Sequence, residues 1–378
     1  MQSMSTHIKS PTHNESGEEN FDLPEEIIID ILLRLPVKSI LKFRCVSKSW
    51  LSLISSQLFI ETHVRVSTEN SKLNGHKLIF TVPYSTSDSD QMQCSVRSLL
   101  CEQPLTDALN IDYPMKHPPM HVWMVGSCNG LICIAENIKD LFLWNPSIRK
   151  TKRVPSMDLD QNIYNYVAYG FGFDDDDYKI VGIFSVSEER RYKYIMMVYG
   201  LRSDSWKRVG ELEGGIPLPN SIKFASGKLH WWAAPDIDTH SKRDIVCLAL
   251  KSGIYGKVEQ PDYEKDYVNR TLGVLGGCIC VLGDDSDDNI DLWILKEYGV
   301  RGSWSKVSHF PCIQSFSLLL KPLCLLPNGE ILLVNGSSFI VCNPRYSSFT
   351  VLKSMKLQGR FFDVDIFVES LVSPGAER

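Results

Sequence analysis

The sequence contains no apolar run near the roughly 18 residues that a membrane-spanning helix needs. It also lacks a strong charge of either sign, since 45 acidic and 40 basic side chains give a formal net charge of −5. Without a positive field, neither nucleic acid nor a membrane surface is an expected partner. Residues 1–20 lack the basic start and apolar stretch of a secretion signal, so we expect an intracellular protein of the cytoplasm, the nucleus or both.

The eleven cysteines include no C-x-x-C pair. Their odd number and their scatter from Cys45 to Cys342 predict buried free thiols in a reducing compartment. Apolar residues make up 43% of the 378 residues and eight are tryptophan, which is ample material for a packed interior. The length excludes one small domain and fits either two domains or a repeat architecture.

Glycine is absent from residues 21–63, where apolar residues recur at helical spacing. Pro24 suits a first helical turn, Asp22 with Glu25 has the spacing of a capping box, and Pro36 ends the first helix. Its apolar stripe consists of Ile27, Ile28, Ile31, Leu32 and Leu35. A second stripe follows, and Ser47 can cap a third helix that continues to Leu58. Three short helices in about forty residues bury too little surface to stand alone, so a partner or the next domain must cover them.

From residue 64 the apolar period changes to two, which predicts an all-β domain over residues 64–372 between a disordered polar N-terminus (1–20) and a short tail (373–378). Turn residues that open equivalent strands recur at intervals of 47 to 55 residues: Gly75, Gly130, Asp177, Gly227, Gly277 and Gly329. A second series, expected to open each unit's last strand, is Trp144, Trp206, Tyr255, Trp304 and Phe349. Four strands per unit at this period predict a β-propeller of about six blades. Residues 363–368 alternate and are expected to complete the first blade by strand addition.

Loops at the same place in each repeat emerge at the same end of a propeller. The loops between second and third strands vary in length and charge, as on a recognition surface, although ordinary solvated loops remain the alternative for any one of them. The residues expected to contact a substrate there are Glu136, Lys139, Glu188, Arg190, Asp236, Asp238, Asp285, Asp287 and Ser337.

No stretch forms a convincing active site or metal site, and no cofactor is expected. Gly126-Ser-Cys128-Asn-Gly130 matches a nucleophile elbow in letters, but the strand expected at residues 131–134 stands where an elbow needs a helix. The acidic run Asp284 to Asp288 lacks the glycine and glutamate of a calcium loop. Prolines between His117 and His121 preclude the helix that would aim both at one ion.

The N-terminal helices closely resemble an F-box, through Leu23-Pro24, residues 31–41, Phe43-Arg-Cys-Val46 and Ser47-Lys-Ser-Trp50. The rest resembles the F-box-associated, kelch-like domain of plant F-box proteins, through Ser127-Cys-Asn-Gly-Leu-Ile132, Trp144-Asn-Pro-Ser-Ile-Arg149, Tyr169-Gly-Phe-Gly-Phe-Asp174 and residues 290–298. The double glycine of kelch repeats occurs only at Gly276-Gly277, so the blade number rests on spacing.

The resemblance implies an α+β multidomain chain, a three-helix F-box followed by a propeller, that serves as a non-catalytic substrate receptor of an SCF-type ubiquitin ligase. The F-box would bind a Skp-type adaptor and, through it, a cullin, while the propeller would select an unidentified target protein for degradation. The residues implied as adaptor contacts, or as the helix core supporting them, are Leu23, Pro24, Ile28, Ile31, Leu35, Pro36, Leu41, Val46 and Trp50. For Trp50 the core role is favoured.

Two alternatives remain at the level of the sequence. One is a propeller enzyme, such as a kelch-like oxidase with metal-bound Tyr and His. The other is an F-box scaffold or inhibitor that binds the adaptor without delivering substrates.

Overall fold

The protein was analysed as a computed structural model. It describes residues 23–69, 73, 75–83, 89–100, 109–110, 122–136, 139–157, 163–188, 191–212, 215–217, 222–234, 243–263, 267–285, 287, 289–300, 302–311, 320–336, 338–352 and 363–375. Among the residues singled out from the sequence, these lie outside the described residues: 1–20, Asp22, His117, His121, Arg190, Asp236, Asp238 and Ser337.

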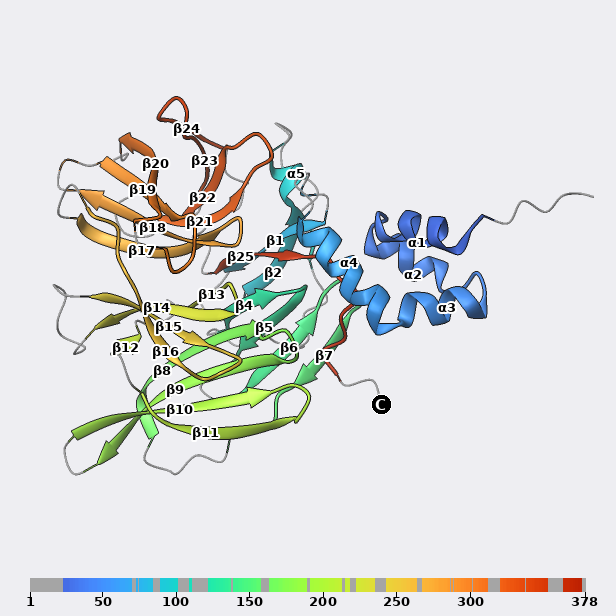
Figure 1. The fold of residues 1–378 in the computed structure, drawn as a ribbon, viewed down its shortest axis with the longest axis horizontal. Helices are drawn as coiled ribbons and strands as arrows, with labels where there is room; N and C mark the ends of the chain where they lie inside the picture. Colours follow the sequence, from blue (N-terminus) through green and yellow to red (C-terminus); the bar gives the residue numbers. More distant parts are fainter. Residues whose placement is uncertain are drawn as a thin grey trace, which may run out of the picture.

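The N-terminal module is helical, as expected, and stands beside a large β domain (Figure 1). Its helices are α1 (Glu25–Leu33), α2 (Val37–Phe43), α3 (Lys48–Ser55) and α4 (Gln57–Glu69). Pro24 and Pro36 occupy the positions just before α1 and α2, and the Ser47 hydroxyl accepts a hydrogen bond from Trp50 N at 3.1 Å. The predicted third helix divides at Ser56, whose extended backbone separates α3 from α4, and α4 continues to Glu69 beyond the predicted module boundary at residue 63.

The β domain is a six-bladed β-propeller of antiparallel sheets. Blade 1 contains β1 (His76–Pro83), β2 (Ser89–Ser95), β3 (Leu109–Asn110) and β25 (Val364–Val368); α5 (Val96–Leu100) follows β2. Blade 2 contains β4 (Trp123–Cys128), β5 (Leu131–Ala135), β6 (Leu141–Asn145) and β7 (Lys150–Arg153). Blade 3 contains β8 (Ile163–Phe173), β9 (Tyr178–Glu188), β10 (Arg191–Gly200) and β11 (Ser205–Glu211).

The remaining blades follow in chain order. Blade 4 contains β12 (Ile216–Pro217), β13 (Lys223–Ala225), β14 (Lys228–Ala234), β15 (Asp244–Ala249) and β16 (Tyr255–Val258), with β12 and β13 both paired to β14. Blade 5 contains β17 (Tyr267–Leu275), β18 (Cys278–Asp285), β19 (Asn289–Leu295) and β20 (Trp304–Pro311). Blade 6 contains β21 (Leu320–Leu325), β22 (Ile331–Asn335), β23 (Ser338–Asn343) and β24 (Ser348–Val351).

The ring closes by strand addition at blade 1, as the alternating residues 363–368 predict. β25 pairs antiparallel with β1, from His76 opposite Val368 to Phe80 opposite Val364. The next blade joins this seam, because Met124 N donates to Asp363 Oδ2 at 2.7 Å and the Ser127 hydroxyl donates to the Ile366 carbonyl. The innermost strands β25, β4, β8, β13, β17 and β21 contact one another in turn around the ring.

The glycine and aspartate markers lie where the spacing predicts, immediately before or near the start of the second strand of each blade. The aromatic series is correct for Trp206, Tyr255, Trp304 and Phe349, which lie at or next to the start of the last strand. It is wrong for Trp144, which lies in β6, the third strand of blade 2, opposite Thr151 of β7. Trp144 is 1% exposed and fills the core between blades 1 and 2, so its bulk serves packing there.

Two tryptophans of the aromatic series, Trp206 and Trp304, form hydrogen bonds to the segment that connects the previous blade to their own. Trp206 Nε1 donates to the Pro155 carbonyl at 2.8 Å, and Trp304 Nε1 donates to the Glu259 carbonyl at 2.6 Å. Both carbonyls belong to the segment that leaves the previous blade. A tryptophan at this position therefore satisfies a linker carbonyl while its ring joins the apolar surface between blades.

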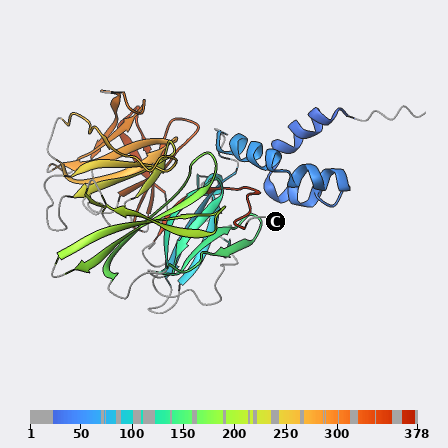
Figure 2. The same cartoon turned by 60° about the horizontal axis from the view of Figure 1, so that its bottom comes forward.

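The C-terminal segment contacts both the helices and the propeller. Leu371 is 2% exposed and packs into the helical core with Leu32, Ile40 and Ile54. The preceding Ser370 is fully buried, and Asn145 Nδ2 donates to the Ser370 carbonyl at 3.1 Å and to the Val372 carbonyl at 2.8 Å. The chain therefore closes the ring with β25 and then completes the helical module, beside α4 in Figures 1 and 2.

Gly130 lies under this segment, at the turn between β4 and β5. Its φ is +82°, and a Cβ there would stand 2.2 Å from Ser370 Oγ and 2.6 Å from the Val368 carbonyl oxygen. We expect Gly130→Ala to lower the free energy of unfolding by about 3 kcal/mol, because backbone strain and overpacking add. Gly277→Ala is the matched control, since Gly277 has φ +79° but no atom within 4 Å of its Cβ position, and should cost only about 1 kcal/mol. If urea denaturation shows the same loss of unfolding free energy for both variants, the packing explanation would be contradicted.

A buried histidine is expected to make the propeller less stable in acid. His230 of β14 is fully buried, its Nε2 lies 3.0 Å from the Tyr298 hydroxyl, and burial lowers its pKa to about 4. The histidine pKa of the unfolded chain is near 6.5, so between pH 6.5 and about 4 the unfolded chain binds more protons than the folded chain. The contribution of neutral His230 to the free energy of unfolding is therefore fully present above pH 6.5 and is lost as the pH falls. We expect His230→Gln to reduce the loss of unfolding free energy between pH 7.5 and pH 5 by about 2 kcal/mol. If the free energy of unfolding depends on pH in the same way for the wild type and for His230→Gln, His230 is not a source of the loss of stability in acid.

The described cysteines are free, and most but not all of them are buried as the sequence predicts. Of the described cysteines, Cys45 is exposed, Cys278 is half-buried, the others are buried, and none forms a disulfide. No helix among the described residues is both long enough and apolar enough to cross a bilayer.

Candidate functional site

Helix α1 carries apolar residues on two sides. Leu32 is 1% exposed and fills the helical core, with Ile28 packed beside it. Ile27 and Ile31, with Leu23 just before the helix, are 48%, 47% and 58% exposed. Ile27 and Ile31 lie four residues apart and so share one face of the helix, and Leu23 precedes the helix beyond Pro24. An outward apolar stripe on a helix whose inner face already has a core indicates a surface that a second protein covers.

The nine residues predicted as adaptor contacts or supporting core divide by exposure. Leu23, Pro24, Ile31, Pro36 and Val46 are exposed, whereas Ile28, Leu35, Leu41 and Trp50 are half-buried and pack against the helical core. The Trp50 ring meets Phe43 edge to face, with centroids 5.6 Å apart. The exposed five are therefore accessible at the surface, and the half-buried four belong to the packing of the helical module.

Three further apolar side chains of this module are exposed and were absent from the predicted set: Ile27, Leu51 and Leu58. Leu58 is 76% exposed, at the start of α4. Ile27 had a sequence signal, because it lies four residues after Leu23 and four residues before Ile31. Leu51 and Leu58 had none, because helical spacing alone does not say which side of α3 or α4 faces the core.

The second strands end, and the third strands begin, at the opposite end of the propeller from the helices. Helix α4 leads into β1, and its last turn, with Thr68 and Glu69, lines the mouth of the central cavity together with the first-to-second-strand turns at Gly277 and Gly329. In an antiparallel blade, the turns after the first and third strands share one end and the loop after the second strand lies at the other. We call this other end the loop face.

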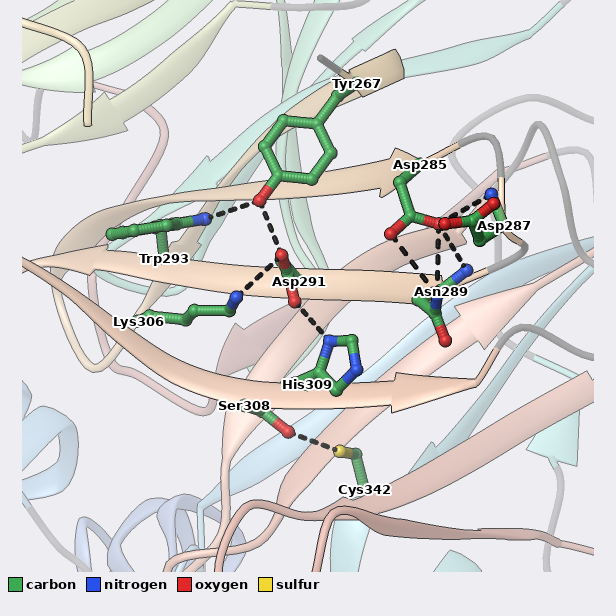
Figure 3. Close-up of polar contacts among 10 residues, drawn as sticks. All are labelled: Tyr267, Asp285, Asp287, Asn289, Asp291, Trp293, Lys306, Ser308, His309 and Cys342. Carbon is green, nitrogen blue, oxygen red and sulfur yellow. Dashed lines mark hydrogen bonds and ion pairs between the residues drawn. The ribbon is translucent and has the colours of Figure 1, made fainter. Parts of the chain in front are cut away.

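The residues predicted to contact a substrate differ in solvent exposure, among those that the structure describes. Lys139 and Asp287 are exposed and Glu136 is half-buried. Glu188 is the last residue of β9. Asp285 is only 6% exposed, and its Oδ1 accepts hydrogen bonds from the backbone N–H groups of Asp287 and Asn289 (Figure 3). Its carboxylate therefore shapes its own loop.

A buried carboxylate organises the neighbouring part of blade 5. Asp291 is 1% exposed; its Oδ2 accepts from the Tyr267 hydroxyl at 2.6 Å and pairs with Lys306 Nζ at 2.9 Å, and its Oδ1 lies 2.6 Å from His309 Nδ1 (Figure 3). Burial alone would raise the pKa of Asp291, but these three hydrogen bonds outweigh it and hold the pKa below its ordinary value. A carboxylate with three donors is a structural anchor that ties β17, β19 and β20 together.

The central cavity has a volume of about 770 Å³ and is lined by inner strands of all six blades. Lys223 and Lys321 reach it from β13 and β21, and Asp365 from β25. Burial lowers the pKa of Lys223 to about 8, with Lys321 contributing in the same direction. Lys321 Nζ donates to the Val364 carbonyl, so this lysine also supports the closing strand.

The cysteine of the elbow-like sequence is structural. Cys128 ends β4, is 9% exposed, and is followed by a tight turn in which Asn129 and Gly130 have φ of +51° and +82° before the strand β5 begins. Burial raises the pKa of its thiol to about 12, so the thiol stays protonated at neutral pH. Among the described residues, no three His, Cys, Asp or Glu side chains are grouped so that they could hold a metal ion.

Comparison with known proteins decides the family. The family described as the F-box associated beta propeller domain matches residues 84–359, and the F-box domain matches residues 21–62. The chain belongs to the F-box proteins with an F-box associated β-propeller. The F-box is thus the helical module, and the predicted fold class, two-domain order and blade number are confirmed.

Relatives from Arabidopsis thaliana extend over nearly the whole chain. F-box/kelch-repeat protein At3g23880 is 29% identical over 96% of this chain and 99% of its own length. Putative F-box protein At3g52320 is 31% identical over 91% of this chain and 85% of its own length. F-box protein CPR1 is 29% identical over 75% of this chain and 72% of its own length. These similarities support a substrate-receptor role for this F-box protein.

Proposed function

We propose that the protein is the substrate-recognition subunit of an SCF-type ubiquitin ligase. Its F-box would bind a Skp-type adaptor and, through it, a cullin, while its propeller would hold a target protein for ubiquitination and degradation. In this role the chain performs no chemistry of its own and acts by raising the local concentration of target near the ubiquitin-loaded enzyme.

The observation that carries the proposal is the outward stripe of α1. Leu23, Ile27 and Ile31 remain about half exposed although the F-box is already packed against the propeller through Leu371. Covering a fully exposed Leu or Ile contributes roughly 1.5–3 kcal/mol, so covering each half-exposed side chain of the stripe contributes about half as much, and the three together offer a share of the free energy of a stable complex. The loop face lies at the other end of the propeller, which leaves it free for a second protein.

The test is affinity purification of the tagged full chain from cells treated with a proteasome inhibitor. The proposal expects a Skp-type adaptor, a cullin and ubiquitinated clients to co-purify, and expects the clients' half-lives to lengthen when the adaptor-binding stripe is mutated. If the adaptor co-purifies but the half-lives of the clients are the same for the wild type and the stripe variant, the protein would be a scaffold and not a ligase receptor.

A further inference from the structure

The central cavity opens at the F-box end of the propeller. Thr68 and Glu69 of α4 lie at its mouth, together with the turns at Gly277 and Gly329. The inner strands β13, β17 and β21 end in their first-to-second-strand turns at this mouth, and β25 ends there beside His76. A residue at the start of one of these strands therefore lies far from the mouth, at a level that we call the floor.

The wall between the mouth and the floor is apolar. Its side chains come from five inner strands and are only half-buried, although these strands are the innermost of their blades: Val125, Phe224, Val274, Leu323 and Ile366. The volume of about 770 Å³ is within the range of pockets that hold small organic ligands, and such pockets are mostly apolar with a few polar groups. The wall therefore suits the apolar body of a small molecule.

Lys223 lies at the floor with its hydrogen-bond donors unused. It is the first residue of β13, is half-buried and lines the cavity, so its side chain can be reached from there. Among the residues that the structure describes, its ammonium group has no hydrogen-bond acceptor and no carboxylate at ion-pair distance. An ammonium group has three N–H donors, and leaving a partly buried charge without partners is costly. The acceptors must therefore come from water or from a ligand in the cavity.

Two further charged side chains line the cavity at the level of Lys223. Lys321 and Asp365 are the second residues of β21 and β25. Lys321 Nζ donates to the Val364 carbonyl, and Asp365 Oδ1 accepts from the next backbone N–H at 2.8 Å. Two ammonium groups and one carboxylate leave one positive charge unbalanced among the groups that line the floor.

The remaining charged and titratable groups near the cavity do not reverse this balance. Asp363 lies near Lys223 but does not line the cavity; its Oδ2 accepts from Met124 N, and burial raises its pKa. With Asp363 fully ionised the floor is neutral, not negative. At the mouth, burial lowers the pKa of His76, so its ring is neutral at pH 7, and Glu69 is exposed, where salt screens its charge. The floor can therefore accommodate one added negative charge.

We propose that the central cavity binds a small organic carboxylate, with the carboxylate on Lys223 at the floor and an apolar body against the wall. The ammonium group donates charge-assisted hydrogen bonds, which are stronger than those between neutral groups. A carboxylate carries one negative charge, whereas a phosphate monoester carries nearly two, which exceeds what the floor balances beside Asp365. This site is separate from the F-box and from the loop face, so it does not depend on the proposed receptor role.

The test is isothermal titration calorimetry of the purified full chain with octanoate and diphenylacetate as probes. Their amides, octanamide and diphenylacetamide, have nearly the same shape but no charge. Both acids should bind, and each should bind about tenfold or more tightly than its amide, because only the acid forms a charge-assisted hydrogen bond with Lys223. Failure of both acids to bind, or equal affinity of each acid and its amide, would overturn the proposal.

Variants at the floor and in the wall locate the binding site. Lys223→Met removes the charge but keeps an unbranched side chain, and should weaken binding of the acids about tenfold or more while leaving the amides unchanged. Val274→Phe narrows the cavity without changing its charge, and should weaken binding of acids and amides alike. The matched controls are Lys207→Met on β11 and Val300→Phe on the turn after β19, both at exposed positions, and neither should change binding. Wild-type affinity of Lys223→Met for the acids, or equal weakening by Lys207→Met, would contradict the assignment.

The pH dependence of binding gives a second test that needs only the wild-type chain. Burial lowers the pKa of Lys223 to about 8; Lys321 acts in the same direction, and Asp365, Asp363 and Cys280 oppose it. Because the bound carboxylate requires the charged ammonium group, the affinity for octanoate should fall about tenfold between pH 7 and pH 9. In Lys223→Met the fall should disappear. An affinity of the wild type that is the same at both pH values would count against Lys223 as the contact.

Discussion

Ile27→Asp combined with Ile31→Asp is expected to abolish co-purification of the Skp-type adaptor, lowering its affinity at least about 100-fold. Both side chains are about half exposed on the outward stripe of α1. In the proposed complex they are covered, and two carboxylates placed in an apolar contact without partners each carry a large desolvation penalty. The free chain should tolerate them, because neither residue fills the F-box core. The measurement is the dissociation constant of the purified chain for the adaptor.

The control for this double variant is Ile254→Asp, which introduces the same charge at an isoleucine that is 67% exposed on the propeller. It should leave adaptor binding unchanged. An alternative pair, Leu35→Asp with Leu41→Asp, is less informative because both leucines pack against the F-box core and their loss would unfold it. Full adaptor affinity of Ile27→Asp with Ile31→Asp, together with an intact circular dichroism spectrum, would remove the basis of the proposed function.

Leu371→Ala is expected to lower the free energy of unfolding of the F-box by about 3–5 kcal/mol and to expose α1 to α4 to protease. Leu371 is 2% exposed and contributes to the F-box core although it belongs to the end of the chain. Truncating a buried leucine removes its transfer free energy and leaves a cavity. Limited proteolysis and differential scanning calorimetry measure the two effects.

The comparison for Leu371→Ala is Leu325→Ala, at the end of β21, where the leucine is 43% exposed and a loss below about 1 kcal/mol is expected. A propeller that stays intact while the F-box is cleaved would show that Leu371 couples the two domains. Comparable calorimetric profiles for the two variants would mean that the F-box core does not depend on the C-terminal segment.

The sequence predicted the two architectures because both are periodic. The four-residue spacing in α1 and the recurring turn residues from Gly75 to Gly329 repeat local geometry, and local geometry is what neighbouring residues encode. Trp144 was placed in the wrong strand because a buried aromatic in a third strand and an aromatic opening a last strand look alike in one dimension. The break at Ser56 was missed because its neighbours on both sides favour a helix.

The parts that sequence reasoning missed depend on residues far apart in the chain. Leu371 reaches the core formed around Ile40 and Ile54 only because β25 has first crossed the ring. The Arg270 guanidinium on β17 lies beside the Trp232 ring of β14, a contact between neighbouring blades that joins residues far apart in the sequence. Inward-facing Asp285 could not be separated from exposed Asp287, since burial of a loop carboxylate depends on which backbone N–H groups turn toward it.

Closure of the ring by its last strand also has a consequence for biosynthesis. His76 pairs with Val368, so β1 leaves the ribosome long before its neighbour in the sheet exists. Until translation is nearly finished, the first blade has an unpaired edge that can associate with other chains or recruit chaperones. A nonsense codon anywhere before residue 364 would therefore yield an open, aggregation-prone product, and none of the shortened products would behave as a receptor lacking only its final residues.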